Sequence, residues 1–241
     1  MTNDLNAANA TVETNSMSPW SMLVSIFYEP TKVFRAIKEK PTWVLPLIVF
    51  LVTMTAAAYF MMPAIQKAQI DYIERSDTYT AEQKAEIKSQ MEAGQGFQWI
   101  GVISSPIVWT IAIFLTLGVT MLMGNVIFGG KARFAQVFSV VVLSFMTWVI
   151  SSIVKTPLIV AKNSVDVRTS LAILLPGETT SGVLYTLLNT YTDVFIVWQM
   201  ILLVIGVKVV YEFATQKAVL TVLTPTLVFA LISAGIAMLV P

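Results

Sequence analysis

Five long runs of apolar residues divide this chain of 241 residues and dominate what it can fold into. A helix needs about 17–25 predominantly apolar residues to cross the hydrocarbon core of a bilayer. The runs cover about residues 43–62, 100–128, 134–154, 193–211 and 219–240. Only 12% of the residues are charged, too few to coat such runs with the polar surface of a soluble domain. The sequence therefore predicts an all-α membrane protein with five transmembrane helices.

An amphipathic segment precedes the first run. Between Pro19 and Lys40 the apolar residues fall within a stripe of about 120° on a helical wheel, a pattern typical of a helix that lies in the membrane interface. Pro30 lies in the middle of this segment, and proline fits best in the first turn of a helix. We therefore expect two short helices, the second starting near Pro30. Residues 1–18 are polar and lack the pattern of a cleavable signal peptide, so we expect a disordered cytoplasmic tail.

Two of the connections between the runs are long. Residues 64–96 contain two helical pieces, and Thr80 begins a T-x-x-Q capping box with Gln83, which predicts a hydrophilic helical hairpin. Residues 161–192 contain apolar pieces too short to cross a bilayer, so we expect short interfacial helices there. No repeat of fixed period is visible, which favours a single bundle.

The short connections indicate the orientation of the chain. Residues 129–133 and 211–217 carry positive charge and lie on the same side of the predicted bundle as the basic segment 32–40. Short basic loops stay in the cytoplasm. This predicts a protein of the cell (inner) membrane with a cytoplasmic amino terminus and an external carboxyl terminus.

The composition excludes several classes of function. The chain has no Cys and no His, which excludes disulfides, thiolate and imidazole metal sites, and nucleophiles that depend on either residue. Its Lys and Arg residues are scattered, so there is no basic field for nucleic acid. The carboxylates of the hydrophilic hairpin do not match an EF-hand. We expect no metal and no cofactor.

Asp193 allows two interpretations. Lys208 follows 15 residues later, a separation of about 22 Å along a helix, which is less than a hydrocarbon core of roughly 30 Å. Both side chains can then point outward from the helix ends, and Asp193 marks where the helix starts. If the helix begins instead near Gly182 or Val183, Asp193 lies within the membrane, where carboxylates are usually functional. The sequence NTYT at 189–192 favours the first interpretation, because it is typical of a helix break.

Lys155 stands near the end of the third run, two residues before Pro157. A proline disfavours helical geometry in the residue before it. We therefore expect the third span to end or kink near Lys155, and the Lys155 side chain to reach toward the headgroups. A Ser-Lys dyad with Ser151 or Ser152 is the alternative, since residues three or four apart share a helix face. The sequence offers no oxyanion hole beside it, and we expect no enzyme.

Three segments together resemble a known family: FYEPTKVFRAI (27–37), FGGKARFAQVFSVVVLSFMTWVISSIVKTPLIV (128–160) and TDVFIVWQMILLVIGVKVVYEFATQKA (192–218). Their order is similar to that of the Yip1 domain family, whose bacterial branch this chain resembles. The resemblance implies that residues 19–241 form one five-helix membrane domain with a cytosolic amino terminus. Eukaryotic members are linked to Rab GTPases and vesicle trafficking, whereas bacterial members are largely of unassigned function.

The resemblance also places the family pattern on particular residues, none of them with a known catalytic role in the family. These family-motif positions are Pro30, Phe34, Gly129, Gly130, Pro157, Asp193, Trp198 and Gly206. The hairpin at 64–96 is longer than the first connection typical of the family, which leaves its role open.

Two functional hypotheses follow. The first is a non-enzymatic membrane protein that organises the bilayer or scaffolds partners, with the helix at 19–40 acting on the inner leaflet. The second is a small-molecule, ion or lipid permease or scramblase, in which Asp193, Asn125 and Lys155 face a shared interior. Expected contacts are membrane lipids and either a partner protein or a second copy of the chain.

Overall fold

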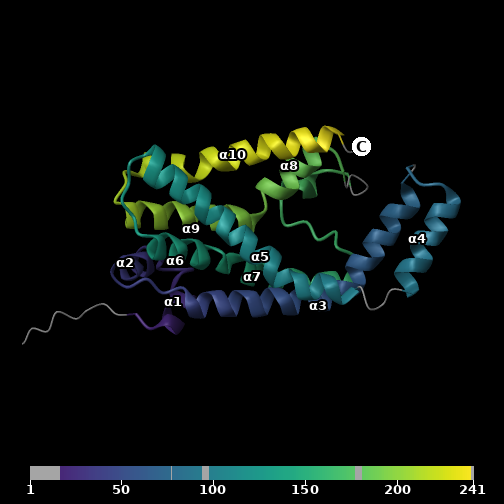
Figure 1. Cartoon of the computed structure of the whole chain (residues 1–241), viewed down its shortest axis with the longest axis horizontal. Helices are drawn as coiled ribbons and strands as arrows, with labels where there is room; N and C mark the ends of the chain where they lie inside the picture. The colour runs from purple at the N-terminus through teal and green to yellow at the C-terminus, as the bar shows by residue number, and fades with distance from the viewer. Residues whose placement is uncertain (1–16, 77, 94–97, 177–180, 240–241) are drawn as a thin grey trace, which may run out of the picture.

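The structure, a computed structural model, describes residues 17–76, 78–93, 98–176 and 181–239, and every element in these ranges is a helix (Figure 1). Most of the predicted disordered tail, residues 1–16, lies outside the described residues, as does residue 240 at the end of the fifth run. The elements are α1 (Pro19–Ser25), α2 (Pro30–Glu39), α3 (Val44–Arg75), α4 (Ala81–Ala93), α5 (Gln98–Met121), the π-helix η1 (Leu122–Ile127), α6 (Phe134–Ser144), α7 (Met146–Lys162), the 3₁₀-helix η2 (Leu171–Leu174), α8 (Val183–Tyr191), α9 (Val194–Tyr211) and α10 (Thr215–Leu239).

Five helical stretches of the described chain are long and apolar enough to cross a membrane, as the sequence predicts. They are Val44–Arg75, Trp99–Ile127, Phe134–Lys162, Val194–Tyr211 and Thr215–Met238. The third stretch is the centre of the bundle: α6 packs along α9, and α7 packs along both α3 and α9. Of its most apolar part 72% is buried, against 11% for α10. The first, second and fifth stretches therefore form the outside of the bundle.

The bundle has two distinct ends. At the near end lie α1, α2, the turn 128–133 and the connection from α9 to α10; at the far end lie η2, α8 and residues 163–170 (Figure 1). The near end is held together by contacts between segments distant in sequence. Lys38 forms an ion pair with Glu212, and Gln136 Nε2 donates to the Lys38 carbonyl over 2.7 Å.

The amphipathic segment is a pair of helices, and α2 starts at Pro30 as predicted. Its apolar stripe, however, does not face the lipid. Val33, Phe34 and Ile37 are fully buried, because α2 packs against α9 and α6. Neighbouring helices therefore cover the stripe of α2, and the depth of this segment in the membrane interface stays a prediction.

The sequence predicts that the third span ends or kinks near Lys155, just before Pro157. The helix does not end there. Helix α7 continues through Pro157 to Lys162, and the break in this span lies at Phe145. Pro157 fixes a φ angle that a helix accepts and is exposed on the outer side of α7, while α7 is held along its length by α3. The packing therefore outweighs the local preference of the residue before the proline.

The hydrophilic hairpin exists, but its first helix is not separate. Helix α3 runs without interruption through Pro63 to Arg75, so the first span and the first half of the hairpin are one helix of 32 residues. The predicted capping box begins α4: Thr80 N–H donates to Gln83 Oε1 over 2.9 Å, and Gln83 N–H donates to Thr80 Oγ1 over 3.3 Å. The arm, meaning residues 64–76 and α4, stands away from the other helices (Figure 1).

Candidate functional site

Asp193 is the residue that begins α9. Its Oδ1 accepts a hydrogen bond from the Phe195 backbone N–H over 2.9 Å, which satisfies one of the free donors of the first turn. Helix α8 ends at Tyr191, so the two helices are not one rod. The helix therefore starts where the interpretation of Asp193 as an end marker places it.

The carboxylate is nevertheless inside the protein. Asp193 is only 6% exposed, and its Oδ2 lies 2.6 Å from Lys155 Nζ and 2.5 Å from Thr169 Oγ1. The Lys155 ammonium also lies 5.6 Å from the centre of the Phe195 ring. We call Asp193, Lys155 and Thr169 the Asp193 cluster. It joins α7, the connection after α7 and the first turn of α9, so the Lys155 side chain points to Asp193.

The cluster keeps the carboxylate ionised. Burial raises the pKa of Asp193, but hydrogen bonds from Lys155, Thr169 and the Phe195 N–H together outweigh it and hold this pKa below its ordinary value. The Lys155 ammonium donates to Asp193, and the Ser152 hydroxyl donates to the Val149 carbonyl over 2.9 Å. Among the described residues, no hydrogen bond joins Lys155 to Ser151 or Ser152, the two serines of the alternative Ser-Lys dyad.

The lowered pKa gives the protein a defined acid sensitivity. A carboxyl whose pKa is lower in the folded state contributes stability that is present above its ordinary pKa of about 4 and is lost as the pH falls through the folded value. We expect thermal unfolding in detergent to change little from neutral pH to about pH 5 and to become easier below about pH 4. Asp193→Asn should remove part of this dependence. If the unfolding temperature falls with pH in the same way for the unchanged protein and for Asp193→Asn, Asp193 does not contribute to the acid sensitivity.

Asn125 lies at the other end of the bundle from the Asp193 cluster. It belongs to η1, and its Nδ2 donates to the Ala132 carbonyl over 3.2 Å. The structure therefore brings together two of the three residues proposed for a pathway and leaves the third apart. The pairing of Asp193 with Lys155 and Thr169 joins residues 38 and 24 positions apart, and no local pattern in the sequence identifies it.

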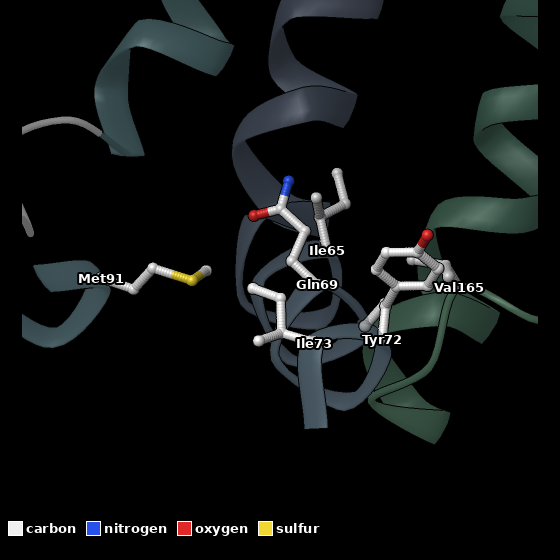
Figure 2. Close-up of a pocket in the computed structure, with 7 residues that line it drawn as sticks. Ile65, Gln69, Tyr72, Ile73, Met91 and Val165 are labelled. Carbon is white, nitrogen blue, oxygen red and sulfur yellow. The ribbon is translucent and has the colours of Figure 1, made fainter. Parts of the chain in front are cut away.

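A second candidate site lies on the arm, where sequence reasoning predicted only a hydrophilic hairpin. A groove of about 370 Å³ opens between the end of α3, α4 and the segment after α7, and it is almost entirely apolar. Figure 2 shows Met91 on one side, Tyr72 and Val165 on the other, and Ile65, Gln69 and Ile73 between them. The groove also includes Ala68. The signal in the sequence is the presence of Ile65, Ile73 and Met91 in a segment otherwise rich in charge.

Polar contacts hold the two walls of this groove in place. Lys88 Nζ lies 2.9 Å from Glu74 Oε1, and Lys84 Nζ donates to the Glu74 carbonyl over 3.0 Å. Tyr72 is 61% exposed and Val165 is 44% exposed. The groove is thus preformed, and its apolar side chains remain available.

At the centre of the bundle, Gly206 lets three helices meet. A Cβ atom at this position of α9 would lie 2.3 Å from Val140 Cγ1 on α6 and 3.2 Å from the Phe34 ring on α2. Val140 and Phe34 are both fully or almost fully buried. Only a residue without a side chain fits this crossing.

The sequence comparison agrees with this architecture. The family model of the Yip1 domain matches residues 24–237, from the end of α1 to the last turn of α10, and so covers four candidate spans completely and nearly all of the fifth. The chain belongs to the Yip1 domain family. It is accordingly an integral membrane protein, and the family is not known for enzymatic activity. No curated protein and no solved structure matches the chain.

Several of the residues predicted as family-motif positions have structural roles in this chain. Gly129 has a φ of +68°, which favours glycine in the turn before α6, and a Cβ on Gly130 would lie 2.4 Å from Tyr211 Cδ1. Trp198 packs against Phe27, with ring centres 5.2 Å apart. Together with Pro30 and Gly206, these residues hold the near end and the crossing of α2, α6 and α9.

Proposed function

We propose that this Yip1 domain protein is a non-enzymatic membrane scaffold that holds a partner protein on its arm. The observation that carries the proposal is the preformed apolar groove on a helical arm beyond the bundle. Helix α3 has 32 residues, about 48 Å of helix, whereas a hydrocarbon core is about 30 Å thick. Its last dozen or so residues, by the same estimate, extend past the membrane on the side of the far end.

The filled interior of the bundle supports a scaffold. Phe34, Phe50 and Leu143 are completely buried between the helices. Two contacts pair polar groups inside the bundle: Trp148 Nε1 donates to Gln199 Oε1 over 2.8 Å, and Asp193 pairs with Lys155. Such pairing fixes helices relative to each other. The buried Tyr211 hydroxyl has no such partner among the described residues.

The chemistry of the groove indicates the kind of partner. Its described lining is mostly aliphatic and aromatic, with the Gln69 amide and the Tyr72 hydroxyl as polar groups, and the arm outside it carries both signs of charge. A groove of this kind accepts the apolar side chains that an amphipathic helix presents at intervals of three and four residues. We therefore propose as partner a protein that presents such a helix on the far-end side of the membrane.

Cross-linking in living cells tests the proposal. With a photoreactive residue in place of Tyr72, we expect a discrete protein adduct whose cross-linked peptide lies on the apolar face of a helix. Ile73→Asp should abolish this adduct, because it places a charge in the apolar groove. Ala85→Asp is the matched control, since it makes a similar change on the exposed side of α4, outside the groove lining. An adduct that survives Ile73→Asp, or that Ala85→Asp also removes, would refute the groove as the docking site.

The alternative function is a pathway for an ion, a small molecule or a lipid, and the buried Asp193 cluster is the observation that favours it. A pathway through this cluster requires that Asp193 and Lys155 separate during transport. A scaffold requires only that the helices they join stay together. The two functions therefore differ in whether the charges themselves are needed.

We also propose that the near end faces the cytoplasm and that the protein lies in the inner membrane of the cell. The support is the Lys and Arg content of the short connections at that end, Lys131 and Arg133 in one and Lys217 in the other, together with the positive charge of α2. In this orientation the arm lies outside the cytoplasm.

A further inference from the structure

We infer that the near end of the bundle is a binding surface for anionic phospholipids. This end gathers eight cationic side chains and three carboxylates, a net charge of +5, although the whole chain carries only +1. The cations are Lys32, Arg35, Lys38, Lys40, Lys131, Arg133, Lys208 and Lys217, and the carboxylates are Glu29, Glu39 and Glu212. These segments lie far apart in sequence, and the fold brings them to one end (Figure 1).

The carboxylates of the near end are mostly occupied by neighbouring lysines. Lys32 Nζ lies 3.2 Å from Glu29 Oε2, and Lys38 pairs with Glu212. The Lys38 ammonium lowers the pKa of Glu212, so this carboxylate stays charged. Six cations have no ion pair within the described residues: Arg35, Lys40, Lys131, Arg133, Lys208 and Lys217. All six are exposed, so the surface offers unneutralised positive charge.

Four of these cations lie where the apolar helices end. Lys131 and Arg133 directly precede α6, Lys208 is in the last turn of α9, and Lys217 is in the first turn of α10. The latter two are positioned by the protein: Lys208 Nζ donates to Thr215 Oγ1 over 2.9 Å, and Lys217 Nζ donates to the Phe128 carbonyl over 3.2 Å. The Lys217 ammonium also lies 5.0 Å from the centre of the Phe213 ring.

This placement identifies the partner as lipid. Apolar side chains exposed beside these cations, such as Phe134 and Leu220, belong to the candidate spans and would face acyl chains. The ammonium and guanidinium groups then lie at the depth of the headgroups, where Lys and Arg attract anionic lipids. A soluble acidic protein would have to enter the headgroup layer to reach them.

Lipid retention by the full chain in nanodiscs tests this inference. The discs contain phosphatidylethanolamine with a minority of phosphatidylglycerol, at the same composition in both leaflets, so the orientation of the chain has no effect on the result. After transfer to a neutral detergent, the lipids that remain bound are identified. We expect phosphatidylglycerol to be enriched several-fold over its share of the disc, because each cation near an anionic surface adds to the attraction.

Two matched variants locate the surface. The near-end variant carries Lys131→Gln, Arg133→Gln, Lys208→Gln and Lys217→Gln. The far-end control carries Lys67→Gln, Arg75→Gln, Lys84→Gln and Lys162→Gln, the same change in charge and residue type. We expect the near-end variant to lose the enrichment and the control to keep it.

Absence of enrichment in the unchanged protein, or an equal loss in both variants, would overturn the inference. Thermal unfolding of each variant shows whether it is folded. If the near-end variant does not fold, the same four positions can be tested with Lys131→Gln and Arg133→Gln in one protein and Lys208→Gln and Lys217→Gln in another. Each pair should lose part of the enrichment, and retention of all of it by both pairs would refute the surface.

Discussion

Gly206→Ala is expected to lower the free energy of unfolding by about 2–3 kcal/mol, the upper part of the range for an overpacked core. An alanine Cβ would lie 2.3 Å from Val140 Cγ1, and Val140 is only 1% exposed and has little room to move. Helix propensity alone would predict the opposite sign, because alanine is more favourable than glycine in a helix by about 1 kcal/mol. Thermal or denaturant unfolding of the purified protein in detergent measures it.

Two further variants separate overpacking from a general intolerance of change. Gly235→Ala on α10 is the control, because nothing lies within 4 Å of the Cβ it would add, and it should be neutral or slightly stabilising. Val140→Ala in the Gly206→Ala background removes the clashing methyl groups and should recover much of the loss. Equal effects of Gly206→Ala and Gly235→Ala would show that the crossing of α2, α6 and α9 is looser than described.

Asp193→Asn is expected to destabilise the protein by about 3 kcal/mol, the lower part of the range for breaking a buried ion pair. The lower part applies because the Lys155 side chain is 21% exposed and can be partly hydrated once its partner is gone. Asparagine begins a helix as well as aspartate does, so this substitution keeps the cap of α9 and removes the charge. The free energy of unfolding at neutral pH provides the measurement.

A double-mutant cycle isolates the pair. Lys155→Met removes the other charge, and in combination with Asp193→Asn it should be more stable than the sum of the single effects, since no unpaired charge remains. Thr169→Val should cost about 1.5–3 kcal/mol, because it removes one hydrogen bond to a charged group. Single effects that simply add would mean that Asp193 and Lys155 do not interact in solution.

The elements set by local pattern could be predicted from the sequence. The five apolar runs predict the five candidate spans because a long apolar helix has few alternatives. Pro30 predicts the start of α2, and Thr80 with Gln83 predicts the start of α4, because caps depend on residues three or four apart. Asp193 as the N-cap of α9 belongs to the same group.

The features that depend on packing could not be predicted in this way. Helices α3 and α7 continue through Pro63 and Pro157 although proline disfavours the interior of a helix, and the two helices pack along each other. The stripe of α2 has the same pattern whether it lies on lipid or on α9, so periodicity alone does not distinguish the two. The family resemblance placed Gly206 among the motif positions, but only the fold supplies the reason, its contact with Val140 and Phe34.

The candidate sites divide in the same way. Asp193 and Lys155 were recognised separately as charges beside apolar runs, but their contact is tertiary and joins α7 to α9. The groove of the arm needs α4 to fold back along the end of α3 and Val165 to close one side. None of these relations has a fixed spacing in the sequence.

The proposed function makes the arm essential and the charges of the Asp193 cluster dispensable, and one measurement compares them. Cross-linking from position 72 in cells is carried out with Ile73→Asp and, separately, with the double variant Lys155→Met and Asp193→Leu. Replacing a buried ion pair with apolar residues is often neutral or stabilising, so the double variant should fold. We expect the partner adduct to be lost with Ile73→Asp and retained with the double variant. Retention with Ile73→Asp would contradict docking in the groove, and loss in a folded double variant would contradict the scaffold by making the charges of the Asp193 cluster necessary.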